Sequence, residues 1–220
     1  METGTTSGPD KIYAVASMQR NEAPYILEWF AYYLINGINH FVIYNHMSTD
    51  ETPQIYERLK KAGYSIDIHH RTGYNVHYPM LQHALTEVLP TVDWLVFADM
   101  DEFYFPERGT LVDTICHFDN YSISALGVNW CAFGSAGRQT DPELVTAGFN
   151  TRGLSDISTN HHYKSIVKGR GRAGQVIGSN PHIFTTQFGT VNVEGTALTH
   201  GHEPNIPVVH HTLRINHYQC

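Results

Sequence analysis

Three acidic residues follow an apolar run near the middle of the chain, in the stretch WLVFADMDEFYFP at residues 94–106. Asp99 and Asp101 are two positions apart, and along an extended segment such side chains point to the same side. At a separation of about 5 Å and an effective dielectric constant of about 20, two carboxylates repel each other by roughly 3 kcal/mol. A proton, a cationic side chain or a metal ion must offset this repulsion. No Lys or Arg is adjacent in the sequence, so the pair indicates a site for Mg²⁺ or Mn²⁺.

Two other roles are conceivable for these acids. They could simply end a strand and face water, which is the favoured interpretation for an isolated D-x-D motif. They could also be the acid and base of a sugar hydrolase, although those carboxylates normally arrive from different strands. The fully apolar strand before them, and the polar clusters that follow two other predicted strands, favour the metal site.

The elements around the acids alternate between strand and helix. Apolar runs predict strands at 12–18, 41–44, 64–70 and 93–98, and helical spacing predicts helices over 25–35, around Ile55 and Leu59, and over 80–89. This alternation implies right-handed crossovers and a mostly parallel sheet covered on both faces, which is an α/β fold. After a further strand at 123–130 the chain becomes rich in loops.

Polar clusters follow three of the predicted strands. They are Arg20-Asn21-Glu22, Ser48-Thr49-Asp50, and the acids from Asp99 to Glu102. Ligands of open α/β sheets bind at the carboxyl ends of the strands. The order of the elements therefore predicts that the three clusters meet at one crevice.

The composition limits the partners. The chain has 220 residues, which suits one sizeable domain, and its net charge of −7 argues against a nucleic-acid partner. No apolar run approaches the roughly 20 residues of a membrane span, and three cysteines without paired spacing favour a reducing compartment. We therefore expect a cytoplasmic protein, with peripheral membrane association left open. Residues 1–10 are expected to be a disordered lead-in.

One local concentration of positive charge stands against this acidic background. Four of the cationic residues lie within nine positions, Lys164, Lys168, Arg170 and Arg172. They are interpreted either as a solvated loop or as a local grip for an anionic ligand.

With these residues in view, the sequence resembles the GT-A-fold glycosyltransferases, in particular the family-2-like and family-92-like group. The matching segments extend from Arg20 to Tyr218 and are, in order, RNEAPYILEWFAYYLINGINHFVIYNHMSTDET, DWLVFADMDEF, VNWCAFGSAG, KSIVKG and LRINHY. The resemblance implies a single Rossmann-like GT-A domain over residues 11–220 with a loop-rich C-terminal acceptor region. It also implies a nucleotide-sugar donor, preferentially UDP-linked, with its diphosphate on Mn²⁺ or Mg²⁺. The expected reaction is transfer of the sugar to a hydroxyl of a glycan or glycolipid, with inversion favoured.

The resemblance assigns roles at matching positions. Asp99 and Asp101 match the metal-binding D-x-D, and His217 looks like the C-terminal histidine that completes the metal or diphosphate site. Donor-binding roles are implied for Arg20, Asn21, Glu22, Asp50, Gln82 and Lys164. Two features depart from the family: Asn45 stands where an acid is usual, and the chain stops at Cys220 where relatives continue with a basic segment. The chain is therefore also interpreted as a domain truncated at its C-terminus.

The remaining site residues follow from their chemistry. Trp130 could stack on an acceptor sugar or simply end a strand in the core, and His182 is an acceptor-side candidate that could equally be structural. Inversion would need a general base, for which Glu102 and Asp156 are the candidates. Glu102 could instead anchor the loop.

Two rival functions remain open. His200, His202, His210, His211 and His217 lie within eighteen residues and could hold Zn²⁺ in a metal-dependent hydrolase, although their spacing matches no zinc signature. The other rival is a non-catalytic sugar-binding domain.

Overall fold

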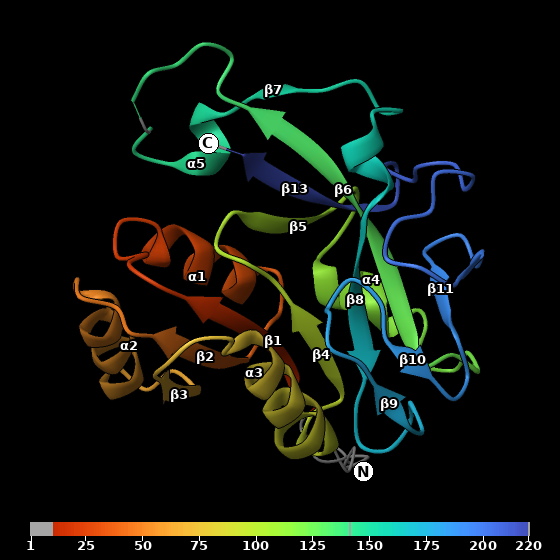
Figure 1. Ribbon diagram of the computed structural model, residues 1–220, viewed down its shortest axis with the longest axis horizontal. Helices are drawn as coiled ribbons and strands as arrows, with labels where there is room; N and C mark the ends of the chain where they lie inside the picture. The colour runs from red at the N-terminus through yellow and green to blue at the C-terminus, as the bar shows by residue number, and fades with distance from the viewer. Residues whose placement is uncertain (1–10, 141, 220) are drawn as a thin grey trace, which may run out of the picture.

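The computed structural model describes residues 11–140 and 142–219, so the lead-in expected at 1–10 lies outside the described residues. Its central element is an 11-stranded sheet, supplemented by the hairpin β9–β10 (Figure 1). The strands are β1 Tyr13–Gln19, β2 His40–His46, β3 Ile66–Arg71, β4 Trp94–Phe97, β5 Glu102–Pro106, β6 Ala125–Gly134, β7 Thr151–Arg152, β8 Tyr163–Lys168, β9 Val176–Ile177, β10 Thr185–Thr186, β11 Thr190–Asn192, β12 Ala197–Leu198 and β13 Leu213–Gln219. The helices are α1 Ile26–Ile35, α2 Thr52–Lys61, α3 His77–His83, α4 Leu111–Cys116 and α5 Val145–Gly148, with short turns of other helix types at Ala84–Val88, Leu89–Thr91 and Ser158–His161.

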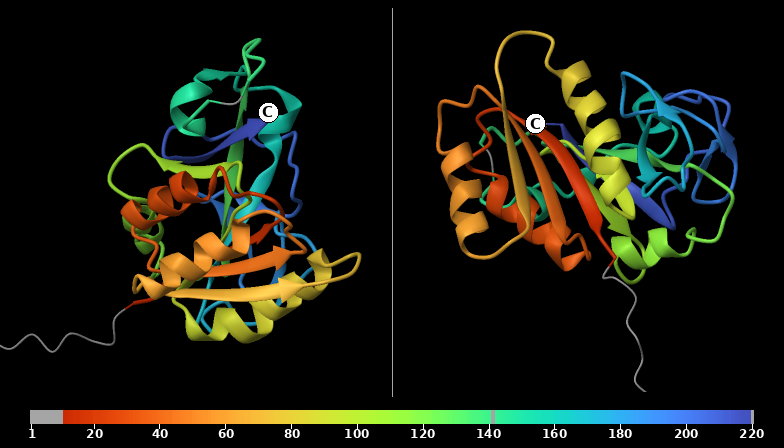
Figure 2. Two further views of the ribbon diagram at one scale, coloured as in Figure 1. Left: turned by 90° about the vertical axis from the view of Figure 1, so that its left-hand side faces the viewer. Right: turned by 90° about the horizontal axis from the view of Figure 1, so that it is seen from below.

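The first half of the chain forms the predicted parallel sheet. Strands β3, β2, β1 and β4 are neighbours in that order and all run parallel. Helices α1 and α2 cover one face and α3 covers the other (Figure 2). Side chains alternate accordingly, so that Val15 belongs to the same buried cluster as Phe30 and Tyr56, while Ala16 belongs to the cluster of Leu85 on the opposite face. The apolar runs of the sequence are therefore buried strands, as predicted.

The second half of the chain adds strands of both directions. Strand β8 is antiparallel to β4 and to β6, and β13 lies between β5 and β6, antiparallel to the first and parallel to the second. The pairing of β13 with β5 sets His217 opposite Glu102. Thus the last described strand closes onto the segment that follows the acids.

The helix predicted over 80–89 differs in detail. It begins earlier, at His77, and α3 is followed by a π-helical turn at Ala84–Val88 and a 3₁₀ turn at Leu89–Thr91. Pro90 has no N–H for an α-helical hydrogen bond, which accounts for the tighter final turn. The strand predicted at 123–130 is likewise longer and runs to Gly134.

Candidate active site

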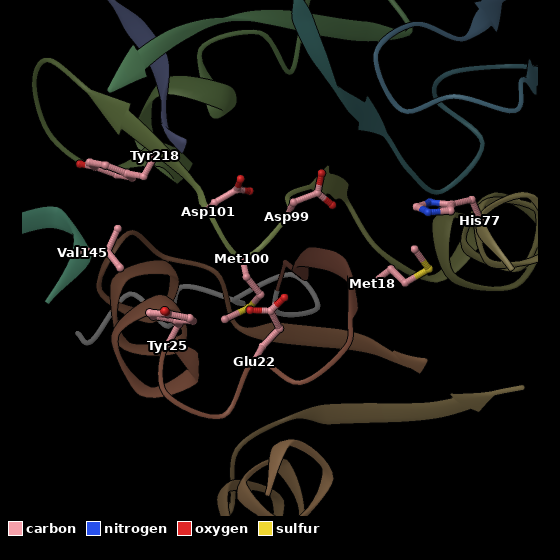
Figure 3. Close-up of a pocket in the computed structure, with 9 residues that line it drawn as sticks. All are labelled: Met18, Glu22, Tyr25, His77, Asp99, Met100, Asp101, Val145 and Tyr218. Carbon is pink, nitrogen blue, oxygen red and sulfur yellow. The ribbon is translucent and has the colours of Figure 1, made fainter. Parts of the chain in front are cut away.

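A pocket of about 480 Å³ opens where β1 and β4 end. The chain leaves β1 for β2 on one side and returns to β4 on the other, so this is the switch point at which open α/β sheets bind ligands. Figure 3 shows the lining side chains, which are Met18, Glu22, Tyr25, His77, Asp99, Met100, Asp101, Val145 and Tyr218. The crevice predicted from the order of the elements is therefore present.

Asp99 and Asp101 lie in a tight turn between β4 and β5. The Glu102 N–H donates to the Asp99 carbonyl oxygen at 3.1 Å, and the indole N–H of Trp29 donates to the same oxygen at 3.0 Å. The segment is thus a turn and not the extended chain assumed from the sequence. The two aspartates nevertheless point to one side and Met100 to the other (Figure 3). Their side chains are 59% and 47% exposed, so both can be reached from the pocket.

Lys164, from β8, supplies the positive charge that the sequence around the acids lacks. Its Nζ lies 2.5 Å from Asp99 Oδ2 and 2.5 Å from Glu102 Oε2, and its side chain is only 2% exposed. Burial alone would lower the pKa of Lys164, but the carboxylates of Glu102 and Asp99 outweigh it and raise the pKa. The ammonium is enclosed by these two acids, so it does not fit the diphosphate contact expected of it.

Glu102 lies beneath the pocket and does not line it. Its carboxylate is fully buried, and it accepts hydrogen bonds from the Asp99 N–H at 2.8 Å and from the indole N–H of Trp130 at 2.8 Å. A general base must reach the acceptor hydroxyl, and this geometry does not allow it. The anchoring role considered for Glu102 fits instead. The other candidate base, Asp156, is exposed in the loop after β7 and is not among the lining residues.

Glu22 is the third carboxylate of the pocket. Partial burial and, to a smaller extent, the negative charges of Asp101, Asp50 and Asp99 together raise its pKa to about 6. The Lys164 ammonium, beneath the pocket, compensates the charge of Asp99. With three carboxylates in its lining, the pocket still carries excess negative charge.

His217 comes from β13 and meets Asp101. Its Nε2–H donates to Asp101 Oδ2 at 3.1 Å, while its Nδ1 is buried without a hydrogen-bond partner. Within residues 11–140 and 142–219, no three His, Cys, Asp or Glu side chains converge closely enough to hold an ion by themselves. The structure therefore brings His217 to one of the two aspartates but does not form a complete three-residue metal site.

The loops expected to bind the donor are fastened to each other. Asn21, at a positive φ of 58°, accepts from the Thr49 N–H at 2.8 Å, and Asp50 accepts from the N–H groups of Ala23 and Thr52, both at 3.0 Å. Of the predicted donor-binding residues in these loops, only Glu22 lines the pocket. Arg20 is exposed at the end of β1, and Gln82 donates to the Gly178 carbonyl oxygen at 3.0 Å without reaching the pocket.

Trp130 and His182 pack beside the carboxylate turn. The Trp130 ring centroid lies 4.3 Å from that of His217 and 5.0 Å from that of His182. The His182 Nδ1–H donates to the Tyr163 carbonyl oxygen at 2.7 Å. Neither side chain lines the pocket, so their expected acceptor contacts are not supported by the geometry.

The other three residues of the cationic cluster, which are Lys168, Arg170 and Arg172, have partners within the chain. Arg170 and Arg172 contact Asp93, Arg172 also contacts Asp119, and the Lys168 ammonium donates to backbone carbonyls. Asp93 directly precedes β4, so this network lies at the end of the sheet opposite the pocket. The interpretation of these residues as a grip for an anionic ligand is not supported.

The tail histidines do not gather. His200 contacts Glu203, His211 contacts Glu194, and His210 donates to the Trp130 carbonyl oxygen. His202 packs against His162, with ring centroids 4.5 Å apart. Of the five, His217 alone reaches the carboxylate turn, and the hydrolase interpretation loses its geometric basis.

Several pocket residues were not singled out from the sequence. Tyr25 and Tyr218 lie in segments that resemble the glycosyltransferases, so attention to aromatic side chains there could have found them. Met18 and His77 lie beside predicted elements and carry no distinguishing pattern. Val145 comes from the loop-rich region, and nothing in the sequence indicates that it reaches the pocket.

The parallel half of the sheet, the switch-point pocket and its carboxylates agree with the GT-A arrangement that the sequence resemblance implies. The sequence profile of glycosyltransferase family 92 matches residues 11–216, and the chain belongs to this family. A family 92 protein of Oryza sativa subsp. japonica is 28% identical over 160 residues, covering 70% of this chain and 26% of the relative. A family 92 protein of Ricinus communis is 27% identical over 158 residues, covering 70% and 28%. The chain thus spans about a quarter of the length of these relatives.

The solved structures that this chain resembles are more distant. S. aureus TarS, residues 1–349, gives a TM-score of 0.48 at 19% identity, covering 71% of this chain and 47% of that one. The mannosyltransferase PcManGT from Pyrobaculum calidifontis, solved with GDP-Man and Mn²⁺, gives a TM-score of 0.45 at 22% identity. The match covers 59% of this chain and 39% of that one. Across the part of this chain that the structure describes, no helix is long and apolar enough to cross a membrane.

Proposed function

We propose that this chain carries the donor-binding and catalytic site of a glycosyltransferase that moves a sugar from a nucleoside diphosphate to a hydroxyl of a glycan or glycolipid. The observation that carries the proposal is the pair Asp99 and Asp101, presented to a switch-point pocket in a chain of family 92. A UDP-linked donor is our first choice, on the resemblance of the sequence to the family.

The donor set of the pocket fits a divalent cation. Asp99 and Asp101 are both reachable, and the carboxylate of Glu22 lines the same pocket. Oxygen ligands and few protein contacts suit Mn²⁺ or Mg²⁺, which complete their coordination with water and substrate phosphates. We propose that Asp99 and Asp101 hold this ion and that His217 orients Asp101. When bound, the ion would stabilise charge on the leaving diphosphate.

The chain's own residues have three tasks in this reaction. Lys164 and Glu102 fix the turn from below, so that Asp99 and Asp101 keep their directions without rearrangement. The Asn21 and Asp50 contacts fix the loops beside the turn. For inversion, a carboxylate must accept the proton of the acceptor hydroxyl, and we assign this to Glu22, which faces the pocket and has a pKa near the working range.

A thermal-shift panel tests the donor site. UDP-, GDP- and CMP-sugars are each added with and without Mn²⁺, because a ligand that binds only the folded state raises the melting temperature. We expect stabilisation by one nucleotide class with Mn²⁺, and loss of it in Asp101→Asn but not in Glu57→Gln, an exposed acid on α2. Stabilisation by Zn²⁺ without any nucleotide response would refute the donor site. Donor binding without transfer or donor hydrolysis would favour the sugar-binding alternative.

A further inference from the structure

The pocket has two chemically different parts. The carboxylates of Glu22, Asp99 and Asp101 lie in its middle, and Tyr25, Val145 and Tyr218 form one end (Figure 3). Tyr218 is 3% exposed, and its ring centroid lies 5.0 Å from that of Phe133 and 5.5 Å from that of Phe103. We call this end, formed by Tyr25, Val145 and Tyr218, the aromatic end. Aromatic and aliphatic surfaces with a few polar atoms are the usual lining for the face of a sugar ring.

The aromatic end is built outside the parallel half of the sheet. Tyr25 immediately precedes α1, Val145 begins α5, and Tyr218 lies on β13. The opposite end, with Met18 and His77, is formed where β1 ends and α3 begins. Nucleotides bind at the ends of the parallel strands in such folds, so the nucleoside belongs to the Met18 end and the aromatic end is left for the acceptor.

Helix α5 cannot hold its own position. It has four residues, and a single helical turn is not stable in isolation. The Glu28 carboxylate, on α1, accepts three hydrogen bonds from the first two residues of α5. The donors are the Val145 N–H at 2.7 Å, the Thr146 N–H at 2.9 Å and the Thr146 hydroxyl at 2.6 Å. One side chain distant in sequence therefore fixes the segment that carries Val145.

Helix α1 also holds the carboxylate turn. Trp29, next to Glu28, donates to the Asp99 carbonyl oxygen at 3.0 Å, and the Tyr33 hydroxyl donates to the Glu102 carbonyl oxygen at 2.9 Å. Helix α1 thus contacts both α5 and the carboxylate turn.

We propose that the aromatic end binds the ring of the acceptor sugar, and that Glu28 is a positioning residue that sets the width of this subsite by holding α5 against α1. The inference deepens the proposed function and rests on it. It assigns the acceptor contact to Tyr25, which is the most exposed of the three residues, in place of Trp130 and His182.

The first test compares Glu28→Gln with Glu28→Ala and with the control Glu57→Gln. Glutamine keeps one acceptor oxygen, so it can retain the Thr146 contacts but leaves the Val145 N–H unpaired. The probes are p-nitrophenyl monoglycosides, with Kd measured by saturation-transfer NMR on the UDP- and Mn²⁺-loaded protein. We expect a roughly tenfold weaker Kd in Glu28→Gln, a larger loss in Glu28→Ala and no change in the control. Hydrogen exchange at Val145 and Thr146 should become faster in both Glu28 variants.

A second pair of variants reports on stacking. Tyr25→Phe keeps the ring and should bind the glycosides like the wild type, whereas Tyr25→Ala should lose most binding. Nucleotide-dependent thermal stabilisation should be unchanged in every one of these variants.

Three results would overturn the inference. The wild type could fail to bind any glycoside while the nucleotide still stabilises it. The Glu28 variants could show faster exchange at α5 with unchanged glycoside affinity. Glu28→Gln could lose the nucleotide response, which would place the donor at the aromatic end. Failure of the proposed function itself is distinct, because then no nucleotide stabilises the wild type.

Discussion

Lys164 allows two acids to coexist at the base of the pocket. Its ammonium contacts Asp99 on the pocket side and Glu102 in the interior, where Glu102 also has two N–H donors. Breaking a buried ion pair by removing one partner typically costs about 3–5 kcal/mol, because the remaining charge stays buried. The turn that presents Asp99 and Asp101 therefore depends on a cation that comes from a strand far along the chain.

Lys164→Met should lower the free energy of unfolding by about 3 kcal/mol. Chemical denaturation of the variant measures this, with Lys60→Met, an exposed site on α2, as the control. Adding Glu102→Gln to Lys164→Met should restore part of the loss, since the uncompensated charge is then gone. A Lys164→Met protein as stable as the wild type would show that Glu102 is already neutral in the fold.

Glu22→Gln should make the fold more stable near neutral pH. The pKa of Glu22 is about 6 in the folded chain and 4.5 ordinarily, so between these values the folded state holds more protons than the unfolded state. Ionised Glu22 therefore costs stability that grows as the pH rises from about 4.5 to about 6 and stays constant above. Allowing for its partial exposure, the cost is about 1 kcal/mol.

Melting temperatures measured without metal at about pH 4 and about pH 7 check this expectation. The melting temperature of the variant should be higher than that of the wild type at about pH 7 and equal to it at about pH 4. Because we assign Glu22 as the proton acceptor, transfer by the same variant should fall by roughly 10²- to 10⁴-fold. Equal melting temperatures at both pH values would mean that neither burial nor the neighbouring carboxylates disfavour the ionised form of Glu22.

The part of the site that could be predicted is the part that a short stretch of sequence determines. Asp99 and Asp101 follow an apolar strand, and that pattern was sufficient to expect a pair of acids on one side at the sheet edge. The partner Lys164 and the wall residue Val145 reach the pocket through tertiary contacts that no local spacing encodes. For the same reason Trp130 and His182, singled out by residue type, proved to lie beside the turn and not in the pocket.

At the level of elements, the loop-rich region is fastened to the sheet by buried amides. Asn160 is fully buried, and its side-chain oxygen accepts from the Ala132 N–H of β6 at 2.8 Å. Asn129 donates to the Asn160 carbonyl oxygen at 3.0 Å and accepts from the Val209 N–H at 3.0 Å. These bonds join β6 to the segments before β8 and before β13.

Asn160→Leu should destabilise the fold by about 1–3 kcal/mol, because the Ala132 N–H would remain buried without a partner. Urea unfolding measures the change, and Asn205→Leu serves as an exposed control. An unaltered midpoint would mean that water or a neighbouring carbonyl replaces the amide without cost.

The elements themselves were predictable to different degrees. Strands β1, β2 and β4 and helix α1 have continuous apolar runs or clear helical spacing, and they lie where expected. The short strands after β6 have two or three residues each, too few for a period to emerge. The antiparallel insertion of β8 between β4 and β6 depends on long-range pairing, which strand patterns do not determine.

For the whole molecule, charge should govern how the proposed anionic donor approaches. The net charge is −7, and the pocket contains three carboxylates. Without metal, association of a nucleoside diphosphate should therefore become faster as salt rises from about 0.01 M to about 0.1 M, over which the screening length falls from about 30 Å to about 10 Å. Stopped-flow measurements with UDP, with and without Mn²⁺, test this. Slower association with added salt would indicate steering by a local cation, and Arg20→Gln would then identify it.

Helix α1 has a consequence for engineering. Four of its residues, Glu28, Trp29, Tyr32 and Tyr33, hold α5, the carboxylate turn and β5 through their side chains. Exchanging only the loop-rich segment between family members would separate α5 from α1, the helix whose Glu28 binds it. A chimaera designed to change what the enzyme accepts should therefore transplant α1 together with α5 as a matched pair.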